Sequence, residues 1–400
     1  MTYLTLAPET ARLAVEVKEW AVREVRPFAR EADRIHDIPD AANKVAESCP
    51  IKQTPLGGRL DYPRRGAADF DPAATDGPHY LGSALVESLY YGDILASLLI
   101  RQGESLSDRV VRTMGTPEQV DRWIAPISKG EINMISFAMT EPSSGGSDPG
   151  RLQTTARRVG DSWILNGHKH FCSNGAISDL LCVFATIDPA LGRRGIRAFV
   201  LPRETPGLVI IKRNESKLGL RSMMTTEFVL ENAEIPLDSM VGYGRDDDAL
   251  RGLKAGLAAL NSTRGYMASI AVGHAQAAVD EARAHLARHR NFIAVNRVRA
   301  LDEELDRMDA ALDRGRQLTR RFALLVDAGQ PYRRAASVAK AYTCPLAERI
   351  IARVIQHMGT FGTSEESLVE KWHRDIKILD IFEGTGNIQR IVLGRELRSA

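Results

Sequence analysis

The feature that most limits the fold of this chain is a block of strand-length segments between two helical regions. From Ile135 to about Gly242, short β-rich runs follow one another, separated by turn residues; they include LLCVFATI, GIRAFVLP and TEFVLENAEI. No helical pattern lies between these runs, which disfavours a doubly wound parallel sheet. The spacing instead predicts a compact antiparallel β domain, a sandwich or a barrel.

Both flanks of this block have apolar residues at helical spacing. One or two amphipathic helices are expected within residues 8–48, with further helices at 79–101 and around 117–129. A segment rich in Gly, Pro, Asp and Arg at 50–78 predicts a long loop. On the carboxyl-terminal side, four stretches have an apolar stripe opposite a charged face, as in a helix bundle. They lie at about 247–288, 298–327, 332–358 and 364–381.

The predicted fold is therefore α+β and multidomain. Four hundred residues are enough for two or three domains. We expect an N-terminal helical domain, a middle antiparallel β domain and a C-terminal helical bundle, with limits at residues 1–133, 134–243 and 244–400.

Composition restricts the function classes. The 53 Lys and Arg residues nearly balance the 51 Asp and Glu residues. A net charge this small does not favour nucleic acid or an anionic membrane as a partner. No apolar run approaches the roughly 18–20 residues that span a bilayer, and the amino terminus lacks a signal-peptide core. The four cysteines are scattered without metal-ligand spacing. Reduced thiols in a cytoplasmic protein are the simplest interpretation.

Two motifs lie within the predicted β domain. The segment FAMTEPSSGGSD ends a predicted strand in a polar loop that is suited to a phosphate or the edge of a heterocycle, although such a segment alone is more often a surface turn. The segment SWILNGHKHFCSNG predicts a hairpin that turns at Asn166-Gly167. None of the nine histidines shows H-E-x-x-H or paired spacing, so no metal site is expected.

Three places in the helical region each allow a structural and a functional interpretation. QHMGTFG, from Gln356 to Gly362, is typical of a helix C-terminus, with a nucleotide contact as the alternative. Arg264 lies in a long apolar helix, where a buried arginine more often pairs with an acid than contacts a ligand. Glu383, in DIFEGTGNIQR, is either the acid of a helix start or a base aimed into an apolar pocket.

In this order, several segments together resemble the acyl-CoA dehydrogenase family over nearly the whole chain. They are FAMTEPSSGGSD, WILNGHKHFCSNG, KLGLRSMMT, QHMGTFG and RDIKILDIFEGTGNIQR. The resemblance implies the three-part architecture above, with a four-helix bundle at the carboxyl end and assembly as a tetramer. It also implies FAD between the β domain and the bundle, with the adenine end reaching a neighbouring subunit.

The resemblance further implies roles for individual residues. Flavin contacts are expected at Phe137, Met139, Thr140, Ser147, Phe171 and Ser173, at Thr385 and Asn387, and, toward a partner's FAD, at Gln356, Met358, Gly359 and Thr360. Arg264 matches an arginine near the substrate thioester, Asn261 stands where many members have an acidic residue that faces the CoA arm, and Gly384 would leave room for close approach. Glu383 matches the catalytic base.

These residues imply FAD-dependent α,β-dehydrogenation of an acyl thioester, either acyl-CoA or carrier-bound. Glu383 would remove the α-proton, because a bound acyl chain desolvates the carboxylate and raises its pKa. The β-hydrogen would leave as hydride to flavin N5. An electron-transfer flavoprotein is the expected acceptor of the electrons.

The sequence also departs from the family pattern. The loop TEPSSGGSD is one residue longer than usual, and RHRNFIAVNRVRALD replaces the usual Arg-x-x-Phe-Gly segment and its later Gln. Arg288 or Arg290 would then fill the arginine role. Weak FAD binding, a different partner chain and a carrier other than CoA are all open. The alternatives to a homotetrameric dehydrogenase are a subunit that completes a partner's FAD site in a heterotetramer and a same-fold flavin oxidase.

Overall fold

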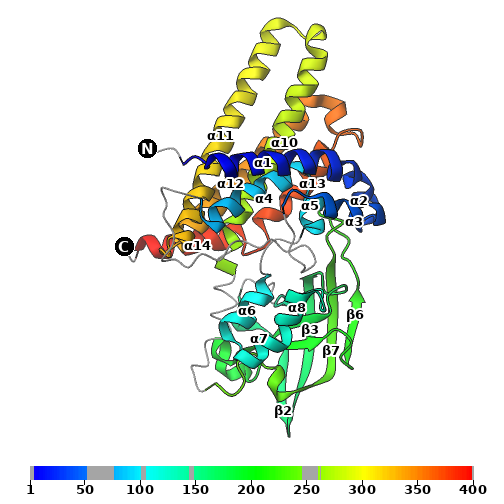
Figure 1. Ribbon diagram of the computed structural model, residues 1–400, viewed down its shortest axis with the longest axis vertical. Helices are drawn as coiled ribbons and strands as arrows, with labels where there is room; N and C mark the ends of the chain where they lie inside the picture. The colour runs from blue at the N-terminus through cyan, green and yellow to red at the C-terminus, as the bar shows by residue number, and fades with distance from the viewer. Residues whose placement is uncertain are drawn as a thin grey trace.

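The computed structural model describes residues 4–51, 76–100, 105–143, 148–245, 260–261 and 263–398. Figure 1 shows a helical body with the β domain at one end and a long helical hairpin projecting from the other. The predicted fold class, helical at both ends of the chain with a β domain between them, is confirmed. The exact domain limits stay a prediction. The loop predicted at 50–78 lies almost wholly outside the described residues.

The amino-terminal helices divide between two cores. A π-helical turn and a 3₁₀ turn containing Pro27 follow the first helix, so the segment 8–48 is more interrupted than its periodicity predicts. The first five helices lie with the carboxyl-terminal bundle, whereas α6–α8 pack on the β sheet (Figure 1). The helices are α1 (Pro8–Trp20), α2 (Ala29–Ile35), α3 (Asp40–Val45), α4 (Pro78–Gly92), α5 (Ile94–Leu99), α6 (Leu106–Met114), α7 (Pro117–Trp123) and α8 (Ala125–Lys129).

Within the described residues, seven strands form one sheet in the order β1-β4-β2-β3-β7-β6, with β5 paired to β4. Strand β4 is buried along its whole length. Cys182 and Phe184 face the core shared with α6–α8, and Leu181 and Val183 face the opposite core, which explains the continuous apolar run LLCVFAT. The strands are β1 (Ile135–Ala138), β2 (Thr155–Val159), β3 (Ser162–Ser173), β4 (Leu180–Thr186), β5 (Ile196–Pro202), β6 (Leu208–Lys212) and β7 (Thr225–Pro236).

Most strand pairs are antiparallel, as predicted, but β1 pairs with β4 in parallel, and β2 meets β4 in parallel at Thr155 and Thr186. A parallel pair needs a long crossover connection. The β2–β3 hairpin lies between β1 and β4 in the sequence and supplies it.

The turn predicted at Asn166-Gly167 is wrong. Strand β3 runs through both residues, and the β2–β3 turn lies at Gly160-Asp161. Gly167 is needed for close packing, because a Cβ there would lie 2.4 Å from the hydroxyl oxygen of Thr154. The register between β3 and β7 shifts at this point, so Asn166-Gly167 marks a bulge within the strand.

The carboxyl-terminal bundle is built on α10, which packs against α4, α11 and α12. Gly273 lets α10 approach α4 closely, because a Cβ there would lie 2.1 Å from the carbonyl oxygen of Glu87. The first predicted stretch begins at 247, and its residues up to 259 lie outside the described part of the chain. The helices are α10 (Tyr266–His289), α11 (Val295–Asp327), α12 (Arg333–Gly362), α13 (Val369–Ile376) and α14 (Gly386–Arg398).

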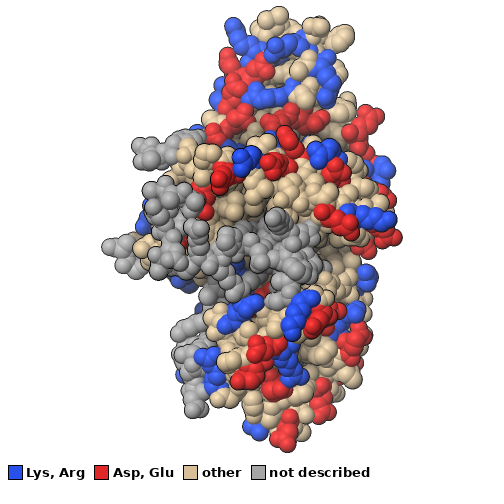
Figure 2. Space-filling view, in the orientation of Figure 1, with Lys and Arg blue, Asp and Glu red and all other residues tan. Residues whose placement is uncertain are grey.

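Charges of both signs are interspersed over the face of the molecule drawn in Figure 2. Among the described residues, no helix is both long enough and apolar enough to cross a membrane.

A buried ion pair fixes the segment after β1 against β3. Lys169 is 0% exposed, and its Nζ donates to Glu141 Oε1 at 2.8 Å and to the carbonyl oxygen of Met139 at 3.3 Å. The Glu141 carboxylate also accepts from the N–H groups of Gln153 and Thr154, at 2.6 and 2.9 Å. Burial opposes ionisation here, but Lys169 and these hydrogen bonds hold the pKa of Glu141 below its ordinary value.

We predict that Lys169→Met lowers the free energy of unfolding by about 3–5 kcal/mol, because Glu141 would remain as an unpaired buried carboxylate. Urea-induced unfolding would measure the change. Glu204→Gln is the control, since it breaks an exposed pair with Arg203 (2.8 Å) in the same domain. That control should cost less than about 1 kcal/mol. Equal effects of the two substitutions would contradict the role given to the buried pair.

Candidate active site

The chain reverses between the 3₁₀ turn η9 (Lys377–Asp380) and α14 through two residues with left-handed backbone. The φ angles are +58° at Glu383 and +86° at Gly384. Glycine adopts this region freely, but for glutamate it costs of the order of 1–3 kcal/mol, so the surrounding structure must hold it.

Lys340 of α12 donates hydrogen bonds to this turn. It is 0% exposed, and its Nζ donates to the carbonyl oxygen of Phe382 and, at 2.8 Å, to that of Gly384. Burial lowers the pKa of Lys340 to about 8. The two carbonyl groups beside Glu383 therefore converge on one buried amine.

Two more side chains complete the support of the turn. Arg264 is buried, and its Nε donates to the carbonyl oxygen of Glu383 at 3.0 Å, while its Nη1 donates to Asn261 Oδ1 at 2.5 Å. Gln389 Nε2 donates to the carbonyl oxygen of Gly384 at 2.8 Å. The consecutive carbonyl groups of 382, 383 and 384 all accept hydrogen bonds from side chains, so the turn is fixed along its length.

The Glu383 carboxylate points toward the segment before α10. Thr263 Oγ1 donates to Glu383 Oε2 at 2.8 Å, and the side chain remains partly accessible. Burial among surrounding groups raises the pKa of Glu383, although the hydrogen bond from Thr263 and the charges of Lys340, Arg264 and Arg109 act in the opposite direction.

The helix-start interpretation of Glu383 does not fit this geometry. Thr385, directly before α14, caps that helix, because its Oγ1 accepts from the N–H of Ile388 at 3.3 Å. The Glu383 carboxylate is bonded to Thr263 instead. It therefore faces the space beside α10 and not the end of its own helix.

A second group of predicted residues lies in the β domain, where β3 meets the end of β1. The N–H of His170 donates to the carbonyl oxygen of Thr140 at 3.0 Å, and Ser136 Oγ donates to that of Ser173 at 2.7 Å. These bonds bring Thr140, Phe171 and Ser173 together. Phe171 has φ +55° and is 56% exposed.

Two other residues of this group are less accessible. Phe137 is partly buried against Phe184, with ring centroids 5.0 Å apart. The side chain of Met139 lies in the core beside α6–α8, and its carbonyl oxygen accepts a hydrogen bond from Lys169. Ser147 lies outside the described residues.

The remaining predicted cofactor residues gather elsewhere. Arg288 and Arg290 are exposed at the end of α10, where they pair with Glu281 (3.5 Å) and Asp302 (2.7 Å). This end belongs to the hairpin that projects away from the β domain (Figure 1). The QHMGTFG segment ends α12 beside it, since Phe361 stacks on His285 of α10 with ring centroids 4.9 Å apart.

Within that segment, exposure differs from residue to residue. Gln356, Gly359 and Thr360 are exposed, but Met358 is 4% exposed and lies in the bundle core. Asn387 is also exposed, at the start of α14. Asn387 therefore lies close to Glu383 in the chain, whereas Arg288, Arg290 and the end of α12 lie on the side of the bundle that carries the hairpin.

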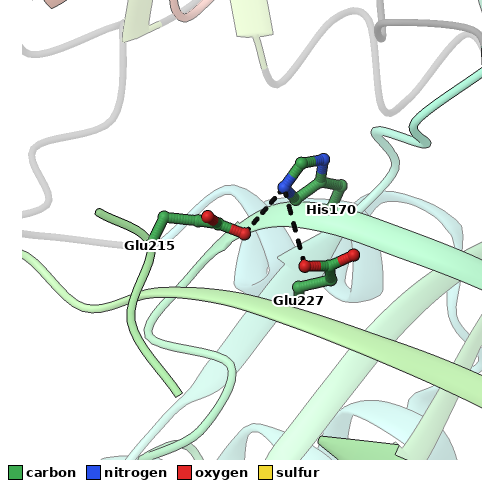
Figure 3. A group of neighbouring side chains, drawn as sticks. All are labelled: His170, Glu215 and Glu227. Carbon is green, nitrogen blue, oxygen red and sulfur yellow. Dashed lines mark hydrogen bonds and ion pairs between the residues drawn. The ribbon is translucent and has the colours of Figure 1, made fainter. Parts of the chain in front are cut away.

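A cluster of titratable groups lies behind Phe171. The ligand atoms of His170, Glu215 and Glu227 lie within 4.8 Å of one another (Figure 3). The expectation that no histidines are paired is wrong, because His168 and His170 are two residues apart on β3, with ring centroids 6.5 Å apart. Residues at this spacing on a strand face the same side of the sheet. Lys212 Nζ contacts both carboxylates, at 3.3 and 3.0 Å, so the cluster is an ion-pair network as it stands.

Sequence reasoning missed Thr263, Lys340, the Lys169–Glu141 pair and His170. A weak signal existed for some of them. Lys340 is a charged residue at an apolar position of its helix, and Thr263 directly precedes Arg264. No local pattern connects Lys340 to residues 382–384, because the contact depends on how the bundle helices assemble.

Comparison with known proteins gives a consistent result. A family model described as "Acyl-CoA dehydrogenase, middle domain" matches residues 136–233, and one described as "Acyl-CoA dehydrogenase, C-terminal domain" matches residues 251–398. The human (Homo sapiens) mitochondrial short-chain specific acyl-CoA dehydrogenase is 34% identical over 401 residues, which cover 98% of this chain and 91% of that protein.

Two solved structures are similar over nearly their whole length. A glutaryl-CoA dehydrogenase from Mycobacterium smegmatis in complex with FADH2 gives a TM-score of 0.81 at 25% identity, covering 99% of this chain and 96% of that one. A prolyl acyl carrier protein oxidase gives a TM-score of 0.81 at 25% identity, covering 98% and 100%.

We predict that Lys340→Met raises the pKa of Glu383 further, because the substitution removes a cation that lowers it. Titration of ¹³C-labelled glutamate carboxyl groups would measure the pKa, with Glu383→Gln identifying the resonance. Lys377→Met is the control, since Lys377 pairs with Glu348 and not with the turn. An unchanged pKa in Lys340→Met, or the same change in both variants, would contradict the arrangement described.

Proposed function

Because this chain belongs to the acyl-CoA dehydrogenase family and is a flavin oxidoreductase, we propose that it catalyses FAD-dependent α,β-dehydrogenation of an acyl thioester. Glu383 takes the α-proton, the β-hydrogen leaves as hydride, and a double bond forms between the two carbons. CoA or a carrier protein holds the acyl group.

The observation that carries this proposal is the environment of the Glu383 carboxylate. A glutamate in water has a pKa of about 4.3 and is a weak base at neutral pH. Here burial raises the pKa, and Thr263 fixes the orientation of the carboxylate without supplying a compensating positive charge. A general base is most effective when its pKa lies near the working pH. The site therefore shifts Glu383 in the direction that proton removal requires.

The same turn offers a hydrogen-bond donor. The N–H of Glu383 has no acceptor within the described part of the chain. A thioester carbonyl placed there would accept this bond, which strengthens as negative charge develops on its oxygen during removal of the α-proton. Lys340 polarises this donor, because its Nζ binds the carbonyl oxygen of Phe382, which belongs to the same peptide group as the N–H of Glu383.

The β-domain residues fit a flat cofactor with a polar edge. Phe171 presents an exposed ring, and the hydroxyl groups of Thr140 and Ser173 beside it are not engaged in hydrogen bonds with any described residue. We assign these three residues to the flavin ring. FAD, when bound, supplies the acceptor for the hydride.

The two separate groups of predicted cofactor residues support a shared cofactor. Phe171 lies in the β domain, whereas Arg288, Arg290 and Gln356 lie near the end of the α10–α11 hairpin (Figure 1). We therefore propose that each FAD is held between subunits of a tetramer, and that an electron-transfer flavoprotein accepts the electrons. A chain that binds FAD only after mixing with a related chain would instead be a heteromeric subunit.

We predict that Glu383→Gln slows anaerobic bleaching of the flavin by an acyl thioester about 10²–10⁴-fold, because the amide cannot accept the α-proton. Stopped-flow absorbance would measure the rate across short, medium and branched acyl groups, on CoA and on a carrier protein. The control Glu348→Gln removes a carboxylate that pairs with Lys377 and should bleach at close to the native rate. Native-rate bleaching by Glu383→Gln, with FAD bound normally, would end the assignment of the base.

A flavin oxidase is the second candidate, because a prolyl acyl carrier protein oxidase has the same fold at a TM-score of 0.81. The two functions differ in what removes electrons from the reduced cofactor. For a dehydrogenase, we expect peroxide release in air to be far slower than turnover with an artificial electron acceptor. Peroxide formed in equal amount to the unsaturated product, at the full turnover rate, would establish the oxidase.

A further inference from the structure

Phe171 is an outlier in two respects. Its backbone lies in the left-handed region, at φ +55°, and its large apolar ring is 56% exposed. The β3–β7 register shifts between Lys169 and Cys172, so Phe171 lies in a bulge. Bulges re-aim side chains, and strained residues of this kind concentrate at functional sites. An exposed ring on a strained backbone needs something to hold its orientation.

The imidazole of His170 is the group that contacts it. The two rings are stacked, with centroids 3.9 Å apart and an interplanar angle of 16°. The His170 side chain is itself largely buried, and its Nε2 is hydrogen-bonded to Glu215 Oε1 at 2.7 Å. Its backbone N–H is bonded to the carbonyl oxygen of Thr140. His170 is thus fixed at both its ring and its main chain.

Ion pairs anchor the carboxylates around His170. Lys212 bridges Glu215 and Glu227, and its hydrogen bonds to Glu227 lower the pKa of that carboxyl. His168 Nε2 is bonded to Glu227 Oε1 at 2.8 Å. Figure 3 shows the His170 ring directed at both carboxylates, which come from β7 and from the segment after β6.

We propose that His170, anchored by Glu215, is a positioning residue that holds the Phe171 ring in place to receive the flavin. This inference rests on the proposed function, because it requires FAD at Phe171. The side chain of His170 need not touch the cofactor. It acts through the stacked ring of Phe171.

A metal centre is the other interpretation of these residues, since one imidazole and two carboxylates converge. The ammonium of Lys212 already lies against both carboxylates and neutralises part of their charge. A divalent cation would have to displace it. The stacking contact with Phe171 also needs no metal, so the observations favour the positioning role.

The test is a double-mutant cycle read out as FAD affinity. The apoprotein is titrated with FAD, and the dissociation constant is measured by flavin fluorescence and visible absorbance. An aromatic pair contributes about 1 kcal/mol, so we expect His170→Ala to weaken FAD binding about fivefold. In a Phe171→Ala background, His170→Ala should change the affinity by less than about twofold, because the ring through which it acts is gone.

His168→Ala is the matched control. His168 lies on the same strand and bonds the same carboxylate cluster, but it has no stacking contact with Phe171 among the described ring pairs. We expect this variant to bind FAD with close to native affinity. Glu215→Gln, which weakens the anchor, should lower the affinity in the same direction as His170→Ala. If His170→Ala folds poorly, His170→Gln removes the ring but keeps a polar group for Glu215.

The possible results distinguish the positioning role of His170 from a metal centre and from a failure of the proposed function. Equal FAD affinity with and without His170, or an additive effect of His170→Ala in the Phe171→Ala background, would overturn this inference alone. Equal losses in His168→Ala and His170→Ala, together with one equivalent of zinc in the purified protein, would establish the metal centre instead. A native protein that binds no FAD at any concentration would contradict the proposed function itself.

Discussion

The left-handed turn at Glu383 and Gly384 is the constraint on which the site depends. A glutamate adopts this backbone only when its surroundings compensate for the strain. Lys340 of α12, Gln389 of α14 and Arg264 before α10 supply that compensation, because together they bind three consecutive carbonyl groups. These donors are distant in sequence and meet only in the assembled bundle. The position of the carboxylate is therefore a property of tertiary packing.

A second strained residue lies in the β domain. Phe171 and Glu383 are both non-glycine residues with positive φ. A polar side chain contacts each of them: the His170 ring stacks on Phe171, and buried Lys340 binds the carbonyl groups on both sides of Glu383. The buried Lys169–Glu141 pair joins the two segments of the β domain that present Phe171 and Thr140. In the proposed function Glu383 is the base and Phe171 contacts the flavin, so each proposed role falls on a strained residue that has its own support.

The sequence predicted the fold class because strand-length runs and helical stripes are local patterns. The prediction of a turn at Asn166-Gly167 failed. Glycine is required at 167 because the strand packs closely against Thr154, and no local sequence pattern shows that contact. The dispersed motifs pointed to Glu383, Arg264 and Phe171, but could not show how these residues are supported. Lys340, Thr263 and His170 act through contacts between separate elements. His170 was missed for a further reason, since its pairing with His168 follows the two-residue period of a strand.

The predicted cofactor residues lie in two separate groups. Arg288 and Arg290 lie at the end of a projecting hairpin, away from Phe171 (Figure 1). Their proposed contact with FAD requires an assembly, whereas Glu383 and the described side chains that bind its turn belong to one chain.

Deuterium exchange at the acyl α-carbon tests the central claim most directly. An acyl thioester that has α-hydrogens but no β-hydrogen is incubated in D₂O with the FAD-loaded protein, so that proton removal occurs without hydride transfer. Uptake of deuterium is then followed by NMR. If Glu383 is the base, the native protein exchanges the α-position well above the solvent rate and Glu383→Gln falls to that rate. Equal exchange by both proteins would contradict the account.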